Sequence, residues 1–223
     1  MLKIENSNSR LSKMNLKKAT ILLIAGLLYT IFRKVIYMVF PYFATHDLVQ
    51  NAFSVLWLLA AISIIVFAVY FIKEVYPHVR QIQISLYCII FFTGLLIIRK
   101  LPFGILPQSG TAGKLLSDIT RLLNSVAMLF FLFYLHRKIR NTYSSLKKSV
   151  KLSIWGIIPG MILGLISTGF YINFLITGYE IDLNPELGSV TLMIFLFMYV
   201  SIINFLLRFS KVDDYSELLK DTI

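Results

Sequence analysis

The chain has 223 residues, of which 57% are hydrophobic and 15% are charged, and it carries a formal net charge of +11. Soluble domains normally contain about 25% charged residues, so this composition excludes an ordinary soluble protein and predicts a chain with lipid as its solvent. The single cysteine, Cys88, excludes an internal disulfide and a cysteine-cluster metal site.

Six apolar stretches approach the roughly 20 residues that a helix needs to cross a bilayer. In chain order they are 19–40, 52–72, 82–98, 115–135, 152–176 and 190–207. No small-x-small cleavage site follows the first stretch, which favours a retained spanning helix over a signal peptide. The third ends just before Pro102, which cannot continue a helix. We therefore expect an all-α, polytopic membrane protein with a six-helix bundle over 19–209.

The placement of Lys and Arg predicts the orientation, because cytoplasmic loops carry an excess of both. The loop 136–151 has six cations and no acid, whereas 177–189 has three acids and no cation. With the N-terminus and C-terminus cytoplasmic, that side holds all of the 22 basic residues except six. These six are Arg33, Lys34, Arg99, Lys100, Lys114 and Arg121.

The two ends of the chain are polar. Residues 1–18 form a basic arm, which we expect to lie near anionic lipids at the cytoplasmic face. Residues 210–223 form an acidic cytoplasmic tail, for which a frayed terminus is favoured over a partner contact. The general organisation is similar to that of small six-helix bacterial membrane proteins of unassigned activity, which implies the bacterial cytoplasmic membrane. We expect no nucleic-acid partner.

The first helix contains two charges within its apolar run, Arg33 and Lys34, each disfavoured in hydrocarbon by about 2.5–3.5 kcal/mol. At about 100° per residue, its polar residues share an arc of roughly 140°. They are Gly26, Tyr29, Thr30, Arg33, Lys34 and Tyr37. Arg33 lies about 20 Å into a hydrocarbon core of about 30 Å, so an inward-facing role is favoured over snorkelling to the interface.

Two further helices bring cations to the same outer level. Arg99 and Lys100 end the third helix, where snorkelling is the favoured reading. On the fourth helix an arc of roughly 120° is polar, and within it Arg121 can pair with Asp118 at i,i+3. We predict a basic cavity near the outer membrane face that binds or transports an anionic small molecule or lipid head group. Its residues would be Arg33, Lys34, Arg99, Lys100, Arg121, Tyr29, Tyr37 and Asn124.

Several alternatives stay open. The acidic fifth-to-sixth loop could fold over the cations and neutralise them, as a lid or as a structural clamp. A membrane-embedded enzyme acting on a phosphorylated lipid would use Asp118 or His46 for acid–base chemistry, but the chain has no catalytic motif that we recognise. A non-enzymatic role is therefore favoured, and the sequence indicates no cofactor or metal ligand set.

The fifth helix contains small residues at every fourth position, Gly156, Gly160, Gly164 and Thr168. Such a ladder lets two helix backbones approach closely. Packing within the chain is favoured over pairing with a second copy, but a homo-oligomer or a membrane partner protein is the alternative. The third reading of the chain is accordingly an assembly subunit that uses this ladder and the basic cytoplasmic loop.

Overall fold

The computed structural model describes residues 15–44, 46–75, 80–100, 110–177 and 186–212, together with Tyr215 and Leu218. Its long elements are six helices, each with a span that is long and apolar enough to cross a membrane. They are α1 (Leu16–Val39), α2 (Asp47–Val75), α3 (Arg80–Lys100), α4 (Gly110–Lys138), α5 (Ser144–Thr177) and α6 (Glu186–Phe209). The short 3-10 helices η2 (Pro41–Ala44) and η3 (Asn141–Tyr143) lie in two of the connections. The prediction of an all-α, multi-pass fold is confirmed.

The helices extend beyond most of the predicted apolar stretches because polar residues at their ends continue the helical backbone. At the start of α1, the side chain of Asn15 accepts a hydrogen bond from the backbone N–H of Lys18 at 3.0 Å. The N–H of Leu16 donates to Oε1 of Glu74 on α2 at 2.7 Å. Both contacts satisfy backbone donors that the first turn of a helix leaves without an internal partner.

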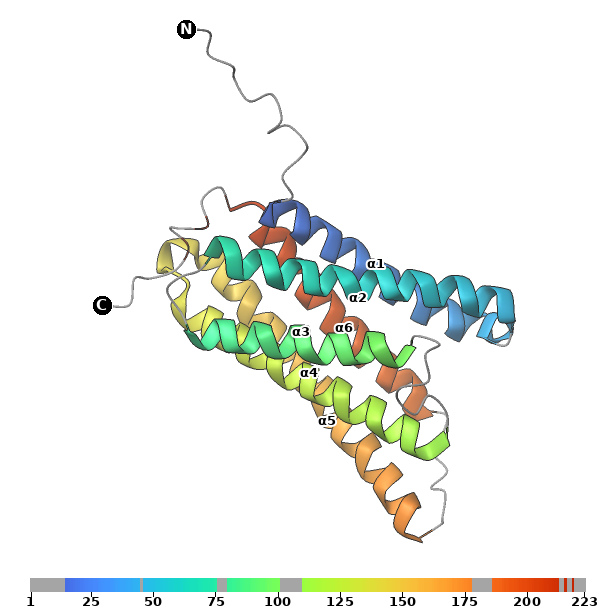
Figure 1. The fold of residues 1–223 in the computed structure, drawn as a ribbon. Helices are drawn as coiled ribbons and strands as arrows, with labels where there is room; N and C mark the ends of the chain where they lie inside the picture. Colours follow the sequence, from blue (N-terminus) through green and yellow to red (C-terminus); the bar gives the residue numbers. More distant parts are fainter. Residues whose placement is uncertain are drawn as a thin grey trace, which may run out of the picture.

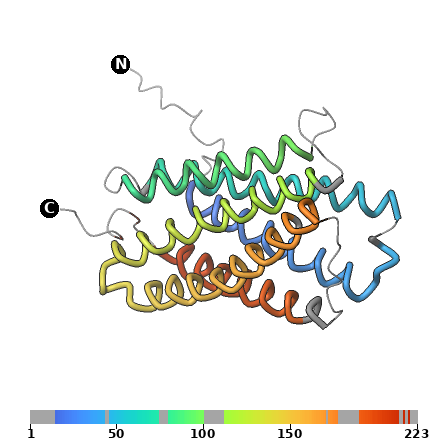
Figure 2. The backbone as a smooth tube through the Cα atoms, turned by 90° about the horizontal axis from the view of Figure 1, so that it is seen from below, coloured from blue at the N-terminus to red at the C-terminus, as the bar shows by residue number. Residues whose placement is uncertain are grey.

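The six helices form a ring in chain order (Figures 1 and 2). Each helix packs against its neighbours in the chain, and α1 packs against α6 to close the ring. Within the described residues, no helices on opposite sides of the ring pack backbone to backbone. We call the end with Leu16, Ile139 and Phe209 the closed end, and the end with Val39, Lys100 and Thr177 the open end. The assignment of the closed end to the cytoplasm remains a prediction from charge.

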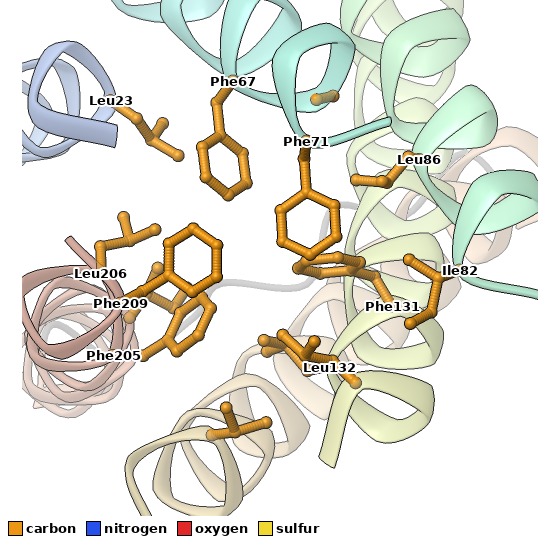
Figure 3. Close-up of a cluster of buried hydrophobic side chains, with 14 of the residues drawn as sticks. Leu23, Phe67, Phe71, Ile82, Leu86, Phe131, Leu132, Phe205, Leu206 and Phe209 are labelled. Atoms are coloured by element: carbon orange, nitrogen blue, oxygen red, sulfur yellow. The ribbon is translucent and has the colours of Figure 1, made fainter. Parts of the chain in front are cut away.

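Phenylalanine side chains from alternate helices meet at the centre of the ring (Figure 3). The ring of Phe71 on α2 lies 5.2 Å from Phe131 on α4 and 5.5 Å from Phe209 on α6, between centroids. Phe67 lies 6.2 Å from Phe209. Aromatic pairs at such separations contribute about 0.5–1.5 kcal/mol each beyond the burial of their area. The centre of the ring is therefore a packed core in the half next to the closed end.

The described residues of the C-terminal tail pack against this end, which for them corrects the expectation of a frayed terminus. Leu218 is fully buried and Val212 is buried as well. The Tyr215 ring lies 4.9 Å from that of Phe209, and the backbone N–H of Arg140 donates to the carbonyl oxygen of Leu218 at 3.1 Å. Val212, Tyr215 and Leu218 lie three residues apart between the acidic residues of the tail. Burial of their apolar surface stabilises this packing.

The tightly packed core does not continue to the open end. Among the described residues, buried positions end at Leu27 on α1 and at Thr93 on α3, and they begin only at Ser201 on α6. The exception is the α4–α5 contact, where Thr120 and Thr168 are buried. In Figure 1 the α1–α2 pair and α5 diverge toward the open end. The fold therefore combines a sealed half with a half whose helices spread apart.

Glycines set the close approaches between neighbouring helices. A Cβ on Gly156 would collide with Oγ of Ser201 on α6, and one on Gly160 would lie 3.3 Å from Sδ of Met198. Gly164 instead faces α4, and Thr168 donates its hydroxyl to the carbonyl oxygen of Gly164 at 2.8 Å. This part of the ladder therefore contacts helices of the same chain.

Gly26, which the sequence places in the polar arc of the first helix, also marks a close approach. A Cβ there would lie 2.6 Å from Oγ of Ser63 and 3.1 Å from Cα of Ala60 on α2. The α1 and α2 backbones therefore meet at small side chains, as helices in lipid commonly do.

Candidate functional site

Lys34 continues the buried face of α1 into the open half. It lies seven residues after Leu27, and seven residues at about 100° each bring a side chain back to the same face. Its ammonium nitrogen lies 3.5 Å from the centroid of the Phe195 ring on α6. Lys34 is half-buried. The inward-facing cation of α1 is therefore Lys34, whereas the sequence favoured Arg33.

Arg33 lies on the flank of α1 that faces α2. Its guanidinium carbon is 5.2 Å from the centroid of the Tyr37 ring, which in turn meets Phe53 edge-on at 5.3 Å. One turn before Arg33, Tyr29 donates its hydroxyl to the carbonyl oxygen of Phe53 at 2.7 Å. The hydroxyl hydrogen of Tyr29 is thus engaged by α2, and Tyr29 holds the two helices together.

Lys100 occupies on α3 a position that corresponds to Lys34 on α1. It lies seven residues after the buried Thr93, so it extends the buried face of α3. Its ammonium nitrogen is 6.0 Å from the centroid of the Trp57 ring on α2, and the side chain is exposed. Arg99 interacts electrostatically with Arg121 and Asp118 on α4. Lys100 therefore contacts α2, and the charge of Arg99 interacts with charges on α4.

Arg121 and Asp118 form an ion pair on α4 at 3.6 Å, as their i,i+3 spacing predicts. The hydroxyl of Ser167 on α5 donates to Oδ2 of Asp118 at 3.4 Å. The Arg121 side chain is nevertheless 65% exposed. One turn toward the closed end, Oδ1 of Asn124 is buried without a hydrogen-bond partner among the described residues. The deepest polar group of the predicted site is thus an unsatisfied acceptor.

The charge of Arg121 reaches cations on two other helices. It acts on Lys34 of α1, on Arg99 and on Lys100 of α3. Arg33 in turn acts on Lys34 and Lys100. Because α1 packs against neither α3 nor α4, the interactions of Arg33 and Lys34 with these helices act across the ring or its open end. We call Arg33, Lys34, Arg99, Lys100 and Arg121 the cation cluster.

Positive charge exceeds negative charge at this site. In the described part of the chain, the carboxylate of Asp118 interacts with Arg121 and Arg99 of the cation cluster. Glu180 and Asp182, the acids that the sequence offers as a cover, lie outside the described residues, as does the side chain of Glu186. Whether the acidic loop covers the cluster therefore stays a prediction.

The charges of the cation cluster suit electrostatic attraction of an anion. Among the described residues, no group of three His, Cys, Asp or Glu side chains could hold a metal ion. The ring of His46 meets that of Tyr42 edge-on, 6.0 Å between centroids, in the connection after α1, while Asp118 is engaged by Arg121 and Ser167. Cations near the hydrocarbon, where the dielectric constant is low, attract an anion more strongly than the same groups do in water.

Sequence reasoning missed the aromatic partners of the two lysines. Phe195 and Trp57 are ordinary apolar residues of spanning helices in the sequence, and they become site residues only once the ring order is known. Tyr199 on α6, on which the charge of Arg121 also acts, was missed for the same reason. No local spacing marks any of the three.

Fold and site together define an integral membrane protein with several spanning helices and a cation cluster at one end of its bundle. Comparisons of the chain with protein families, with curated proteins and with solved structures found no match.

Proposed function

We propose that this protein binds an anion, either a small molecule or a lipid head group, at the cation cluster. The observation that carries the proposal is Lys34, a half-buried cation on the inner face of α1 on which both Arg33 and Arg121 act. Like charges held together in or near hydrocarbon are unfavourable. A protein retains such an arrangement most readily when an anion offsets the repulsion.

Binding from the open end fits the rest of the fold. The phenylalanines at the centre of the ring and the tail residues Tyr215 and Leu218 close the other half. An anion at the cation cluster is thus separated from the closed end by packed side chains. If the protein also moves its ligand across the membrane, Phe71 and Phe209 must separate, because their rings stack at 5.5 Å.

Thermal unfolding of the detergent-solubilised full chain tests the proposal. The probes are inorganic phosphate and dioleoyl phosphatidic acid, compared with sodium chloride at equal ionic strength and with dioleoyl phosphatidylcholine. A ligand at 100 times its Kd stabilises a protein by about 2.7 kcal/mol, which for a chain of this size raises Tm by roughly 5–10 °C. We expect this rise with at least one of the two probes.

Lys34→Met separates binding from a structural role. Removing one of several repelling charges should raise the Tm of the ligand-free protein while reducing the stabilisation by the anionic probe. Lys148→Met, an exposed cation near the start of α5 at the closed end, is the matched control and should leave both quantities unchanged. If Lys34→Met lowers the ligand-free Tm and leaves the response to the probe intact, the cation cluster is a structural feature and the proposal fails.

A further inference from the structure

The cation cluster has more positive charge than one monoanion can balance. Four of its cations, Arg33, Lys34, Lys100 and Arg121, face one interacting carboxylate, Asp118, so three charges are in excess among the described residues. The oxygens of Asp118 are already engaged by Arg121 and by the hydroxyl of Ser167. An anion that approaches Arg33, Lys34 and Lys100 therefore meets cations that no carboxylate of the described residues pairs with.

Lys34 and Lys100 show this most clearly. An ammonium group has three N–H donors. Within the described residues, each of these lysines contacts an aromatic ring, Phe195 or Trp57, and makes neither a hydrogen bond nor an ion pair. Arg33 likewise contacts the Tyr37 ring and pairs with no acid there. Ring contacts stabilise a cation without using its charge-assisted hydrogen bonds, so these donors stay available to a ligand.

The donors also come from three directions. Lys34 and Arg33 project from α1, Lys100 from α3 and Arg121 from α4, and α1 packs against neither of the other two helices. A planar carboxylate presents two oxygens in one plane. A terminal phosphate presents three oxygens arranged around one atom, and it carries a charge of about −1.5 to −2 near pH 7. A terminal phosphate thus matches both the excess charge and the arrangement.

We propose that the ligand carries at least two negative charges on one terminal group, as a phosphomonoester or a pyrophosphate does, and is not a phosphodiester or a carboxylate. This inference rests on the proposed function, since it specifies which anion the cation cluster binds. The terminal phosphate can belong to a lipid head group or to a soluble molecule, because the recognised chemistry is the same.

Two pairs of probes that differ by one methyl group test the inference at pH 8. Dioleoyl phosphatidic acid and dioleoyl phosphatidylmethanol have the same chains but a dianionic and a monoanionic head group. Methyl phosphate and dimethyl phosphate are the soluble pair. We expect the dianion of at least one pair to bind the full-length protein at least about tenfold more tightly than its monoanion. A preference in the lipid pair but not in the soluble pair identifies a lipid ligand. A preference in both pairs shows that the terminal phosphate suffices.

Variants connect the preference to the cluster. Lys34→Met and Lys100→Met should each reduce the ratio of the two dissociation constants severalfold, whereas Lys148→Met should leave it unchanged. Two positions are used so that the test survives if one variant does not fold. Equal binding of dianion and monoanion would overturn this inference and leave the proposed function standing. If none of the four probes binds, both are wrong.

Discussion

The ammonium nitrogen of Lys34 lies 3.5 Å from the centroid of the Phe195 ring, and this contact joins α1 to α6 at the open end of the bundle. It is the place where the first and last helices of the chain meet outside the packed core. A cation over an aromatic face is stabilised by about 0.5–1 kcal/mol when exposed and by about 2 kcal/mol or more when desolvated. The half-buried Lys34 should fall between these limits.

A double-mutant cycle measures this contact. Lys34→Met and Phe195→Leu, made singly and together, should show a coupling free energy of about 1 kcal/mol in unfolding experiments. Phe195→Leu alone should also weaken the binding of an anionic probe, because the ammonium group of Lys34 then loses the ring that holds it in place. Additive effects of the two substitutions would show that the ring does not stabilise the charge.

Two glycines of α5 should respond oppositely to alanine. Gly156→Ala places a Cβ against Oγ of Ser201 and 3.3 Å from Cα of Met198, so we expect it to lower the free energy of unfolding by about 1–3 kcal/mol. Gly169→Ala meets nothing within 4 Å and should raise stability by up to about 1 kcal/mol, because alanine favours the helical backbone.

The same pair of variants tests where the ladder packs. Because Gly156 contacts α6 of its own chain, Gly156→Ala should change the melting temperature without changing the mass of the protein in detergent. A lower mass of the Gly156→Ala variant in detergent would instead show that the ladder packs between two copies of the chain.

The sequence was sufficient for the helices because the requirement for about 20 apolar residues per span is local. It was less informative about which face of each helix looks inward. Leu23 and Leu27 are buried, whereas Leu28 and Phe32 on the same helix are exposed on the protein surface, yet all four are equally apolar. Lipid is as apolar as leucine, so hydrophobic periodicity does not separate core from lipid in such a protein.

That ambiguity explains the exchange of roles between Arg33 and Lys34. The polar arc of α1 contained both, and depth along the helix favoured Arg33. Only the neighbouring helices decide which edge of the polar arc faces the centre of the ring. The edge with Tyr29 faces α2, because the Tyr29 hydroxyl donates a hydrogen bond to Phe53. Partners such as Phe195 and Trp57 depend on the order of helices in the ring, which no local spacing encodes.

The tail should contribute measurably to stability. Leu218 is fully buried at the closed end, so Leu218→Ala should cost about 2 kcal/mol or more in the free energy of unfolding. Leu207→Ala, an exposed leucine near the end of α6, is the matched control and should change stability by no more than about 0.5 kcal/mol. Equal, small effects of the two substitutions would show that the tail is a frayed terminus, as its acidic sequence suggested.

Asp118 should act as an internal competitor of the ligand. Its carboxylate pairs with Arg121 at 3.6 Å and interacts with Arg99, so it neutralises part of the charge that an anion would use. Asp118→Asn should therefore lower the Tm of the ligand-free protein, because the repulsion between cations rises. The same variant should tighten the binding of dioleoyl phosphatidic acid by about three- to tenfold.

Ser167→Ala provides the comparison for this last effect. It removes the hydroxyl that donates to Oδ2 of Asp118 at 3.4 Å but keeps the carboxylate charge, so the affinity should stay within about twofold of the wild-type value. Titration of both variants in the same detergent, at one ionic strength, gives the two dissociation constants directly. If Asp118→Asn weakens binding, the carboxylate positions Arg121 for the anion and does not compete with it, because loss of a competing charge can only strengthen the attraction.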